Sequence, residues 1–242
     1  MNPSPLRIGI AGAGAIGCTL AARLAGHGHT VKVLARGETL AAIRRDGIHL
    51  TDLDGHHHVQ VEASDDAASL GEQDLIFVCA KAQALGVLLA QLQPMIGAET
   101  VVVPVVNGVP WWYFHGEGGR FDGQRVNAVD PDSALSQALD LRHVIGCVVF
   151  ITAHCPASAG AESHTPHLMI FGEPDNRLSP RLERVRALVE SVGIEARATE
   201  RIRDNLWTKI IANLTSNPLS VITGATLEQL YSLPQLRDLV SS

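Results

Sequence analysis

The sequence has few charged residues and no excess of basic ones. Charged residues make up 18% of the 242 positions and apolar residues 46%, and the formal net charge is -6. Disordered chains are rich in charge and poor in apolar residues, so this composition indicates a folded globular protein. A negative chain also lacks the basic surface that nucleic acids and anionic membranes attract, and we expect neither of them as a partner.

Long apolar runs and paired cysteines are also missing. No run approaches the roughly 20 apolar residues of a membrane helix. Residues 8–25 have glycines at structured spacings and only Arg7 as a preceding positive charge, which is unlike a signal peptide. The cysteines form no CxxC pair and are Cys18, Cys79, Cys147 and Cys155. They are predicted to be free thiols, and the protein is predicted to be cytoplasmic.

One candidate metal tract is present, His56-His57-His58. It has no cysteine or carboxylate at ligand spacing. It lies between two short strand patterns, residues 48–50 and 59–62, close to the turn signal Asp54-Gly55. We interpret the tract as the solvated tip of a β-hairpin and predict no metal site.

Strand and helix patterns alternate along the first part of the chain. Short apolar runs that suit buried parallel strands cover residues 6–11, 30–35, 74–80 and 100–106. Helical patterns cover residues 15–25, 38–46 and 82–92. This alternation predicts an α/β fold with a Rossmann-like, doubly wound parallel sheet.

The second part of the chain is less regular. Residues 111–142 lack a period and are interpreted as a long loop or lid with a short helix near residues 133–139. Strands are expected at residues 144–152, 167–172 and 194–198, and an amphipathic helix at residues 179–192.

From residue 201 the pattern is helical, with a break expected at Asn217-Pro218 because proline disfavours a helical conformation in the residue before it. We therefore divide the chain into a Rossmann NADP-binding domain, residues 1–199, and the start of an all-helical second domain, residues 200–242. The second domain is expected to be truncated here.

A glycine-rich loop follows the first strand and opens the first helix. Its residues are Gly12, Ala13, Gly14, Ala15, Ile16 and Gly17. In a GxGxxG loop the first glycine allows a tight turn, the second lets a pyrophosphate approach the backbone, and the third lets the helix pack on the strand. The exposed N–H groups and the helix dipole then attract phosphates. The loop predicts a dinucleotide site.

The residue after the second strand distinguishes NADP from NAD. NAD enzymes usually place Asp or Glu there, about 20 residues past the loop, to bind the ribose hydroxyls. This chain has Arg36, whose guanidinium suits a 2′-phosphate. Glu38 lies nearby and is the one feature that favours NAD. We predict NADP.

A polar stripe marks the helical C-terminal part. Lys209, Asn213 and Asn217 recur at every fourth position among Ile, Leu and Trp. At about 100° per residue they drift by only about 40° per step and share one helix face. Spacing alone leaves two interpretations open, a ligand site or a solvated face bonded to backbone. Hydride addition to a ketone leaves an alkoxide, whose charge a lysine ammonium can offset while donating a proton.

These features resemble the ketopantoate reductase (2-dehydropantoate 2-reductase) family over nearly the whole chain. Besides the glycine loop and Arg36, the resemblance is carried by Cys79-Ala80-Lys81, Val106-Asn107-Gly108, His164-Thr165 and Trp207-Thr208-Lys209…Asn213…Asn217-Pro218-Leu219.

The resemblance implies NADPH-dependent reduction of a 2-oxoacid, in the first place 2-dehydropantoate to pantoate, in pantothenate biosynthesis. It implies that Lys209 is the general acid and that Asn213 and Asn217 hold the substrate. It also implies a homodimer through the helical domain. The further cofactor contacts that it implies are Lys81, Asn107 and Ala153.

Two departures from the family leave alternatives open. Family members have a longer helical domain that supplies a serine and a glutamate to the substrate site, whereas this chain ends at Ser242. The few helices after residue 200 would leave apolar residues uncovered, which favours the interpretation that the sequence is a fragment. These residues are Leu227, Leu230 and Leu236. The alternative is an NADP-binding protein without catalysis. In addition, residues 109–114 form an aromatic run, either a self-packed lid or a wall suited to a bulkier oxo or hydroxy acid.

Overall fold

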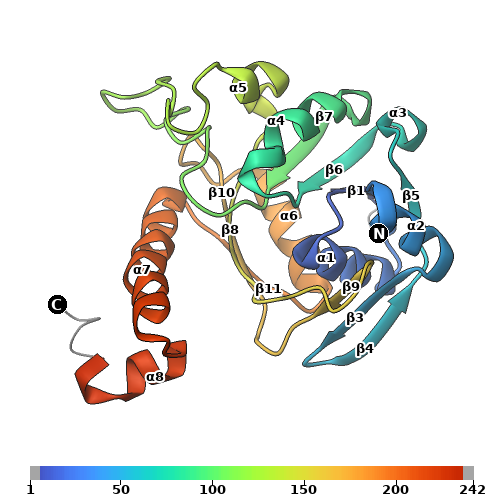
Figure 1. Ribbon diagram of the computed structural model, residues 1–242. Helices are drawn as coiled ribbons and strands as arrows, with labels where there is room; N and C mark the ends of the chain where they lie inside the picture. Colours follow the sequence, from blue (N-terminus) through green and yellow to red (C-terminus); the bar gives the residue numbers. More distant parts are fainter. Residues whose placement is uncertain (1–5, 237–242) are drawn as a thin grey trace. The chain divides into compact units, whose positions relative to one another are not determined.

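The computed structural model describes residues 6–236. The chain forms two compact units that divide between Ile202 and Arg203. The first unit is built on a parallel sheet of five strands in the order β5-β2-β1-β6-β7 (Figure 1). From β1 the chain passes outward to β2 and β5, then returns to β6 and continues to β7. This is the predicted doubly wound, Rossmann-like arrangement, and the prediction is confirmed.

The strands of this sheet are β1 (Arg7–Ala11), β2 (Thr30–Leu34), β5 (Glu62–Ser64), β6 (Gln73–Val78) and β7 (Ile96–Pro104). Ala11 pairs with both Leu34 and Val78, and Val78 pairs with Pro104. The central strands are almost entirely buried, as apolar strands covered on both faces are. The register brings the carboxyl ends of β1, β2, β6 and β7 to one edge.

The helices of the first unit are α1 (Ala15–Gly26), α2 (Gly37–Asp46), α3 (Ala67–Leu70), α4 (Leu85–Gln91), α5 (Ala134–Ala138) and α6 (Pro180–Ser191). Short 3-10 turns occupy Ala82–Ala84, Gln93–Met95 and Leu141–His143. The predicted helix ends are confirmed where a capping residue fixes them, as at the end of α2 and the start of α6. Gly47 ends α2 with a φ of 75°, and the Ser179 hydroxyl accepts the Leu182 N–H at the start of α6.

Two small sheets complete the unit. One has the order β11-β10-β8, from β8 (Gly146–Phe150), β10 (Leu168–Gly172) and β11 (Glu195–Ala198). The other has the order β4-β3-β9, from β3 (Ile48–Asp52), β4 (Gly55–Val59) and β9 (Gly160–Glu162), and α1 packs against it. The sequence did not predict β9, because it is only three residues long and its pairing with β3 is a long-range contact.

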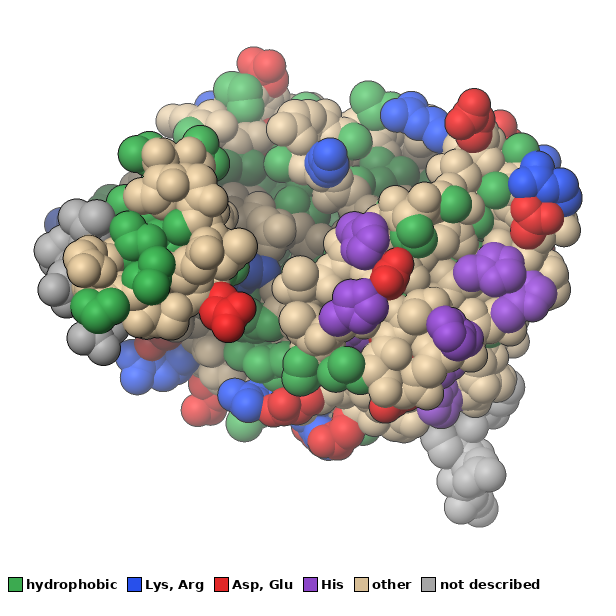
Figure 2. Space-filling model, turned by 60° about the horizontal axis from the view of Figure 1, so that its bottom comes forward, with side chains coloured by type: hydrophobic (Ala, Val, Ile, Leu, Met, Phe, Trp, Pro, Cys, Tyr) green, Lys and Arg blue, Asp and Glu red, His purple; other side chains and the backbone are tan. Residues whose placement is uncertain are grey.

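The prediction for the histidine tract was wrong about its place. His56, His57 and His58 lie within β4, because the turn is tight and Asp52 already pairs with Gly55. The pairing also supplies a carboxylate that spacing did not reveal, since His57 Nε2 lies 3.1 Å from Asp52 Oδ1. Figure 2 shows histidines spread over one face of the molecule. Within residues 6–236, no group of three His, Cys, Asp or Glu side chains could hold a metal ion.

The second unit contains nearly all of α7 (Ile202–Thr223) and the short α8 (Leu227–Ser232). The break expected at Asn217-Pro218 is absent, and α7 runs continuously through Pro218. A proline only biases the preceding residue away from the helix, and helical residues on both sides propagate through it. Just before it, the Thr215 and Ser216 hydroxyls donate to the carbonyls of Ile211 and Ala212, both at 2.6 Å.

The expected uncovered leucines of this unit differ from one another. Leu227 is exposed and Leu236 half-buried, whereas Leu230 is fully buried, contrary to the prediction. α8 begins with a capping box in which Thr226 and Gln229 bond each other's backbone N–H groups. Nowhere in residues 6–236 is there a helix whose length and apolarity would let it cross a bilayer.

Candidate functional site

The glycine loop connects β1 to α1 at the position where the strand order reverses. Two backbone hydrogen bonds fix the loop. The Gly12 N–H donates to the Leu34 carbonyl at the end of β2 at 3.0 Å, and the Cys18 N–H in α1 donates to the Gly14 carbonyl at 2.8 Å. Gly14 is the N-cap of α1, and no acidic side chain lies in the first turn. The positive end of the α1 dipole therefore lies at the switch point, where ligands of open α/β sheets bind.

The three glycines of the loop are needed for different reasons. A Cβ on Gly12 would lie 2.6 Å from the Cys79 carbonyl oxygen, and its φ is 98°; a Cβ on Gly17 would lie 1.9 Å from the Gly12 oxygen. The protein's own backbone thus requires both. A Cβ on Gly14 would have no atom within 4 Å. This open space at a helix N-terminus fits a pyrophosphate that approaches the backbone closely.

The role of Cys79 in this packing was missed by the sequence analysis. Its N–H donates to the Ala11 carbonyl at 2.8 Å, which places its own carbonyl against Gly12. The pairing of β6 beside β1 decides this contact, and no local pattern signals it.

Arg36 lies just past the carboxyl end of β2, as the N-cap of α2. Its side chain is exposed and makes no hydrogen bond or ion pair to any residue between 6 and 236. Glu38 is exposed in the first turn of α2. A guanidinium without an internal partner is available for an anionic ligand.

Lys81 and Asn107 follow β6 and β7, whose carboxyl ends lie at the same edge of the sheet. The backbone pairing of β6 with β7 extends one residue past the end of β7, since the Val105 N–H donates to the Val78 carbonyl at 2.9 Å. Lys81 is exposed, and its ammonium has no partner within the described part of the chain. Asn107 is also exposed, and Gly108 after it has a φ of 93°. The edge therefore carries two cationic side chains and a helix N-terminus, an arrangement suited to a polyphosphate.

Ala153 differs from the other predicted cofactor contacts, because it follows β8, a strand of a different sheet. It is half-buried and precedes His154, whose N–H donates to the Glu162 carbonyl at 3.0 Å.

Two thiols lie beneath the glycine loop. Cys18 is buried in α1 and its Sγ is 3.4 Å from the Ala13 carbonyl. Burial raises the pKa of Cys18 to about 12 and raises the pKa of Cys79 as well. Both stay protonated at neutral pH, so neither can act as a nucleophile or as an anion beside a bound phosphate.

The predicted stripe on α7 belongs to the second unit. Lys209 is half-buried, and Asn213 and Asn217 are exposed, at successive positions along one face of an unbroken helix. Large apolar side chains next to the stripe are exposed too, with Ile211 at 57% and Leu214 at 65%. The stripe thus combines hydrogen-bonding groups with apolar surface, which is the composition of a site for a small organic ligand.

The aromatic run splits into two parts. Trp111 and Trp112 are buried, and Trp112 packs so tightly on β8 that a Cβ on Gly146 would lie 2.5 Å from its ring. Tyr113 and Phe114 form an edge-to-face pair at 5.0 Å, and Phe114 also contacts Phe121. These aromatics pack on the protein and on one another, as in the interpretation of a self-packed lid.

Comparisons with known proteins agree with this architecture. The family model described as ketopantoate reductase PanE/ApbA matches residues 8–110. A 2-dehydropantoate 2-reductase of Mesorhizobium japonicum is 39% identical over 92% of this chain and 68% of that protein.

Solved structures resemble this chain over nearly its whole length. A crystal structure from Ralstonia solanacearum MolK2, named as a candidate ketopantoate reductase, superposes with a TM-score of 0.91 and 43% identity. It covers 98% of this chain and 74% of that one. The 2-dehydropantoate 2-reductase of Geobacter metallireducens GS-15 shares the fold, with a TM-score of 0.80 at 23% identity and coverage of 97% and 71%.

Proposed function

This chain belongs to the ketopantoate reductase family of oxidoreductases, and we propose from this premise that it reduces a 2-oxoacid with NADPH. The favoured substrate is 2-dehydropantoate, which would be converted to pantoate. The observation that carries the proposal is the carboxyl edge of the sheet. There the open space at Gly14 lies at the N-terminus of α1. Arg36 and Lys81 follow β2 and β6, the two strands that flank β1, and their side chains have no partner within residues 6–236.

The cofactor contacts are proposed along that edge. The backbone N–H groups of residues 13–17 would hold the pyrophosphate, with Gly12 making the tight turn, and Arg36 would hold the 2′-phosphate. Lys81 would neutralise further phosphate charge, while Asn107 and Ala153 would complete the contacts. A reduced nicotinamide, when bound, supplies a hydride.

The substrate is proposed to lie on the α7 stripe. Asn213 and Asn217 can hold a carboxylate or carbonyl oxygen through their amide N–H groups. The Lys209 ammonium can donate a hydrogen bond to the carbonyl oxygen, offset the charge that develops on it, and transfer a proton to it. We propose cytoplasmic location and a homodimer as further properties.

The two tryptophans give no support to the alternative of a bulkier substrate, whereas Tyr113 and Phe114 are half-buried. The aromatic run was the feature that motivated it, and Trp111 and Trp112 are 3% and 1% exposed. Side chains buried to this extent, packed on the protein's own strand, offer no surface to a ligand.

The test is NADPH oxidation by the full-length protein against a panel of 2-oxoacids, with Lys209→Ala as the diagnostic variant. Loss of a general acid should lower kcat by roughly two to four orders of magnitude. NADPH affinity should change little, because the proposed phosphate contacts all come from residues 12–107. Asn213→Ala should cost less, since an amide orients the substrate without supplying a proton.

Lys32→Ala is the matched control, since Lys32 is already paired with Glu62 at 3.0 Å. It should keep normal activity. If Lys209→Ala kept near-normal kcat, the proton donor would lie elsewhere, and His164, which is bonded to Glu162 at 2.8 Å, would be tested next. No oxidation with any 2-oxoacid would overturn the proposed activity.

A further inference from the structure

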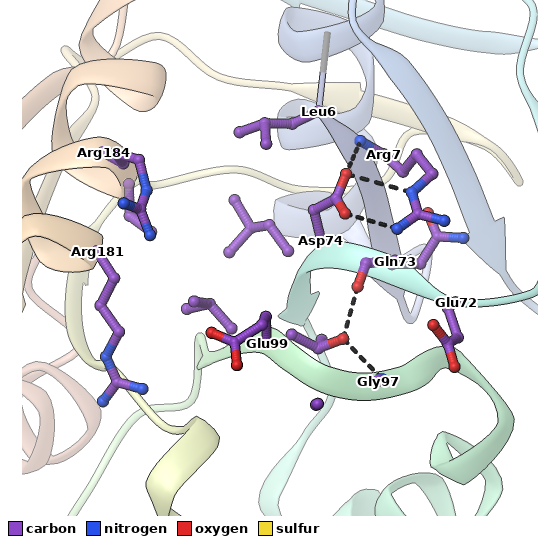
Figure 3. Close-up of a pocket in the computed structure, with 14 residues that line it drawn as sticks. Leu6, Arg7, Glu72, Gln73, Asp74, Gly97, Glu99, Arg181 and Arg184 are labelled. Carbon is purple, nitrogen blue, oxygen red and sulfur yellow. Dashed lines mark hydrogen bonds and ion pairs between the residues drawn. The ribbon is translucent and has the colours of Figure 1, made fainter. Parts of the chain in front are cut away.

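A pocket of about 440 Å³ lies in the first unit at the amino ends of β6 and β7, the edge of the sheet opposite to the glycine loop. Figure 3 shows it between the α6 side, which carries Arg181 and Arg184, and the strand segments that carry Asp74 and Glu99. Its apolar lining consists mainly of Leu6, Leu75, Val101 and Val185. The size lies within the range of small-molecule sites.

An irregularity in the sheet forms one wall. Gln73 pairs with Ile96, but the next pair is Leu75 with Val101, so that Asp74 alone faces residues 97–100. Thr100 fixes this bulge, because its hydroxyl accepts the Gly97 N–H at 2.8 Å and donates to the Gln73 carbonyl at 2.6 Å. Bulges at sheet edges re-aim side chains, and this one directs Glu99 to the pocket.

Half of the charged side chains that line the pocket are already paired. Asp74 pairs with Arg7 at 2.7 Å, and Arg181 pairs with the buried Glu173 at 2.6 Å. Arg184, Glu72 and Glu99 remain, and in the described part of the chain none of them makes a hydrogen bond or an ion pair. Arg184 is on α6, Glu99 is on the bulge, and Glu72 directly precedes β6 (Figure 3). The apolar floor therefore has one available cation and two available carboxylates beside it.

We propose that this pocket binds a small zwitterion with an aliphatic body, of the free α-amino acid class. Its carboxylate would pair with Arg184 and its ammonium group with Glu99, and its side chain would cover the apolar lining. Charge-assisted contacts to both ends give such a ligand an advantage over molecules that carry one charge. The proposal does not depend on the oxidoreductase activity.

Isothermal titration of the full chain with L-leucine tests the proposal, together with three probes that each lack one feature. 4-Methylpentanoate lacks the ammonium group, 3-methylbutylamine lacks the carboxylate, and glycine lacks the aliphatic body. L-Leucine should bind at least about tenfold more tightly than each of them. Equal binding of all four, or no binding of L-leucine, would overturn the proposal.

Variants assign the two ends of the ligand. Arg184→Gln should weaken L-leucine about tenfold and leave 3-methylbutylamine unchanged, whereas Glu99→Gln should weaken L-leucine and leave 4-methylpentanoate unchanged. Glu200→Gln removes an exposed carboxylate outside the pocket and should change nothing. Thermal unfolding of each variant checks the fold. L-Leucine affinity unaffected by both pocket substitutions would contradict the assignment.

Discussion

The two edges of the parallel sheet differ in whether their charged side chains have partners within the protein. At the amino edge Arg7 is bonded to Asp74, and Arg181 near it is bonded to Glu173. At the carboxyl edge, Arg36 and Lys81 have no internal partner within residues 6–236. Paired charges stabilise the fold, whereas unpaired cations beside a helix N-terminus attract an anion from solution. Among the described residues, the amino edge therefore pairs Arg7, Asp74 and Arg181 within the protein and leaves only the groups of the proposed amino-acid pocket unpaired, whereas the carboxyl edge leaves its cations available to the proposed cofactor.

Substitution at Gly14 should give the largest change in cofactor affinity at the carboxyl edge. Gly14→Val should lower the affinity for NADPH and NADH by at least about 100-fold, because the new side chain occupies the space proposed for the pyrophosphate. The fold should remain intact, since the φ of -79° is ordinary and a Cβ there meets no protein atom within 4 Å. Fluorescence titration and thermal unfolding of the purified variant measure both properties.

Gly12→Ala is the contrasting control. Its Cβ would lie 2.6 Å from the Cys79 carbonyl oxygen, so this smaller change should destabilise the fold itself. If folded Gly14→Val kept its affinity for both cofactors, the loop would not be the phosphate site and the contrast between the edges would fail.

Arg36→Gln should have an intermediate effect. We expect NADPH to bind the unaltered chain at least about tenfold more tightly than NADH, and the substitution to remove that preference by weakening NADPH alone. Tenfold corresponds to about 1.4 kcal/mol, within the range of one charge-assisted contact to phosphate. Parallel titrations with both cofactors provide the measurement.

Glu38→Gln is the matched control for Arg36. It lies two residues further along α2 and should leave NADH affinity unchanged if no carboxylate holds the ribose. A marked loss of NADH affinity in this variant, or equal dissociation constants for the two cofactors in the unaltered chain, would favour NAD instead.

The smallest effect is expected at the amino edge. The hydrogen bonds from Arg7 hold the pKa of Asp74 below its usual range. Asp74→Asn should therefore lower the free energy of unfolding by about 0.5 to 1 kcal/mol at pH 7, as is usual for partly exposed pairs. A lowered carboxylate pKa gives stabilisation that is fully present above the unfolded pKa and is lost as pH falls through the folded pKa. The difference between the two proteins should therefore shrink on acidification.

Urea unfolding of Asp74→Asn and of the unaltered chain, at pH 7 and in a series at lower pH, gives this comparison. NADPH affinity should be the same for both proteins. A change in cofactor binding as large as that of Arg36→Gln would show that the two edges are not functionally separate.

The sequence by itself determined the features that depend on local chemistry. The short apolar runs gave the strands, because a strand buried on both faces needs no polar positions. The loop from Gly12 to Gly17 gave the strand-turn-helix unit, and the spacing of Lys209, Asn213 and Asn217 gave one helix face. Each of these depends on residues close together in the chain.

The tertiary structure decided what depends on distant partners. The pairing of β6 beside β1 places the Cys79 carbonyl against Gly12, and the hairpin brings Asp52 to His57. The burial of Trp112 on Gly146 likewise depends on a long-range contact that no local signal shows. Periodicity shows which residues share a face, but only packing between elements shows which of those faces is covered and which is left open for a ligand.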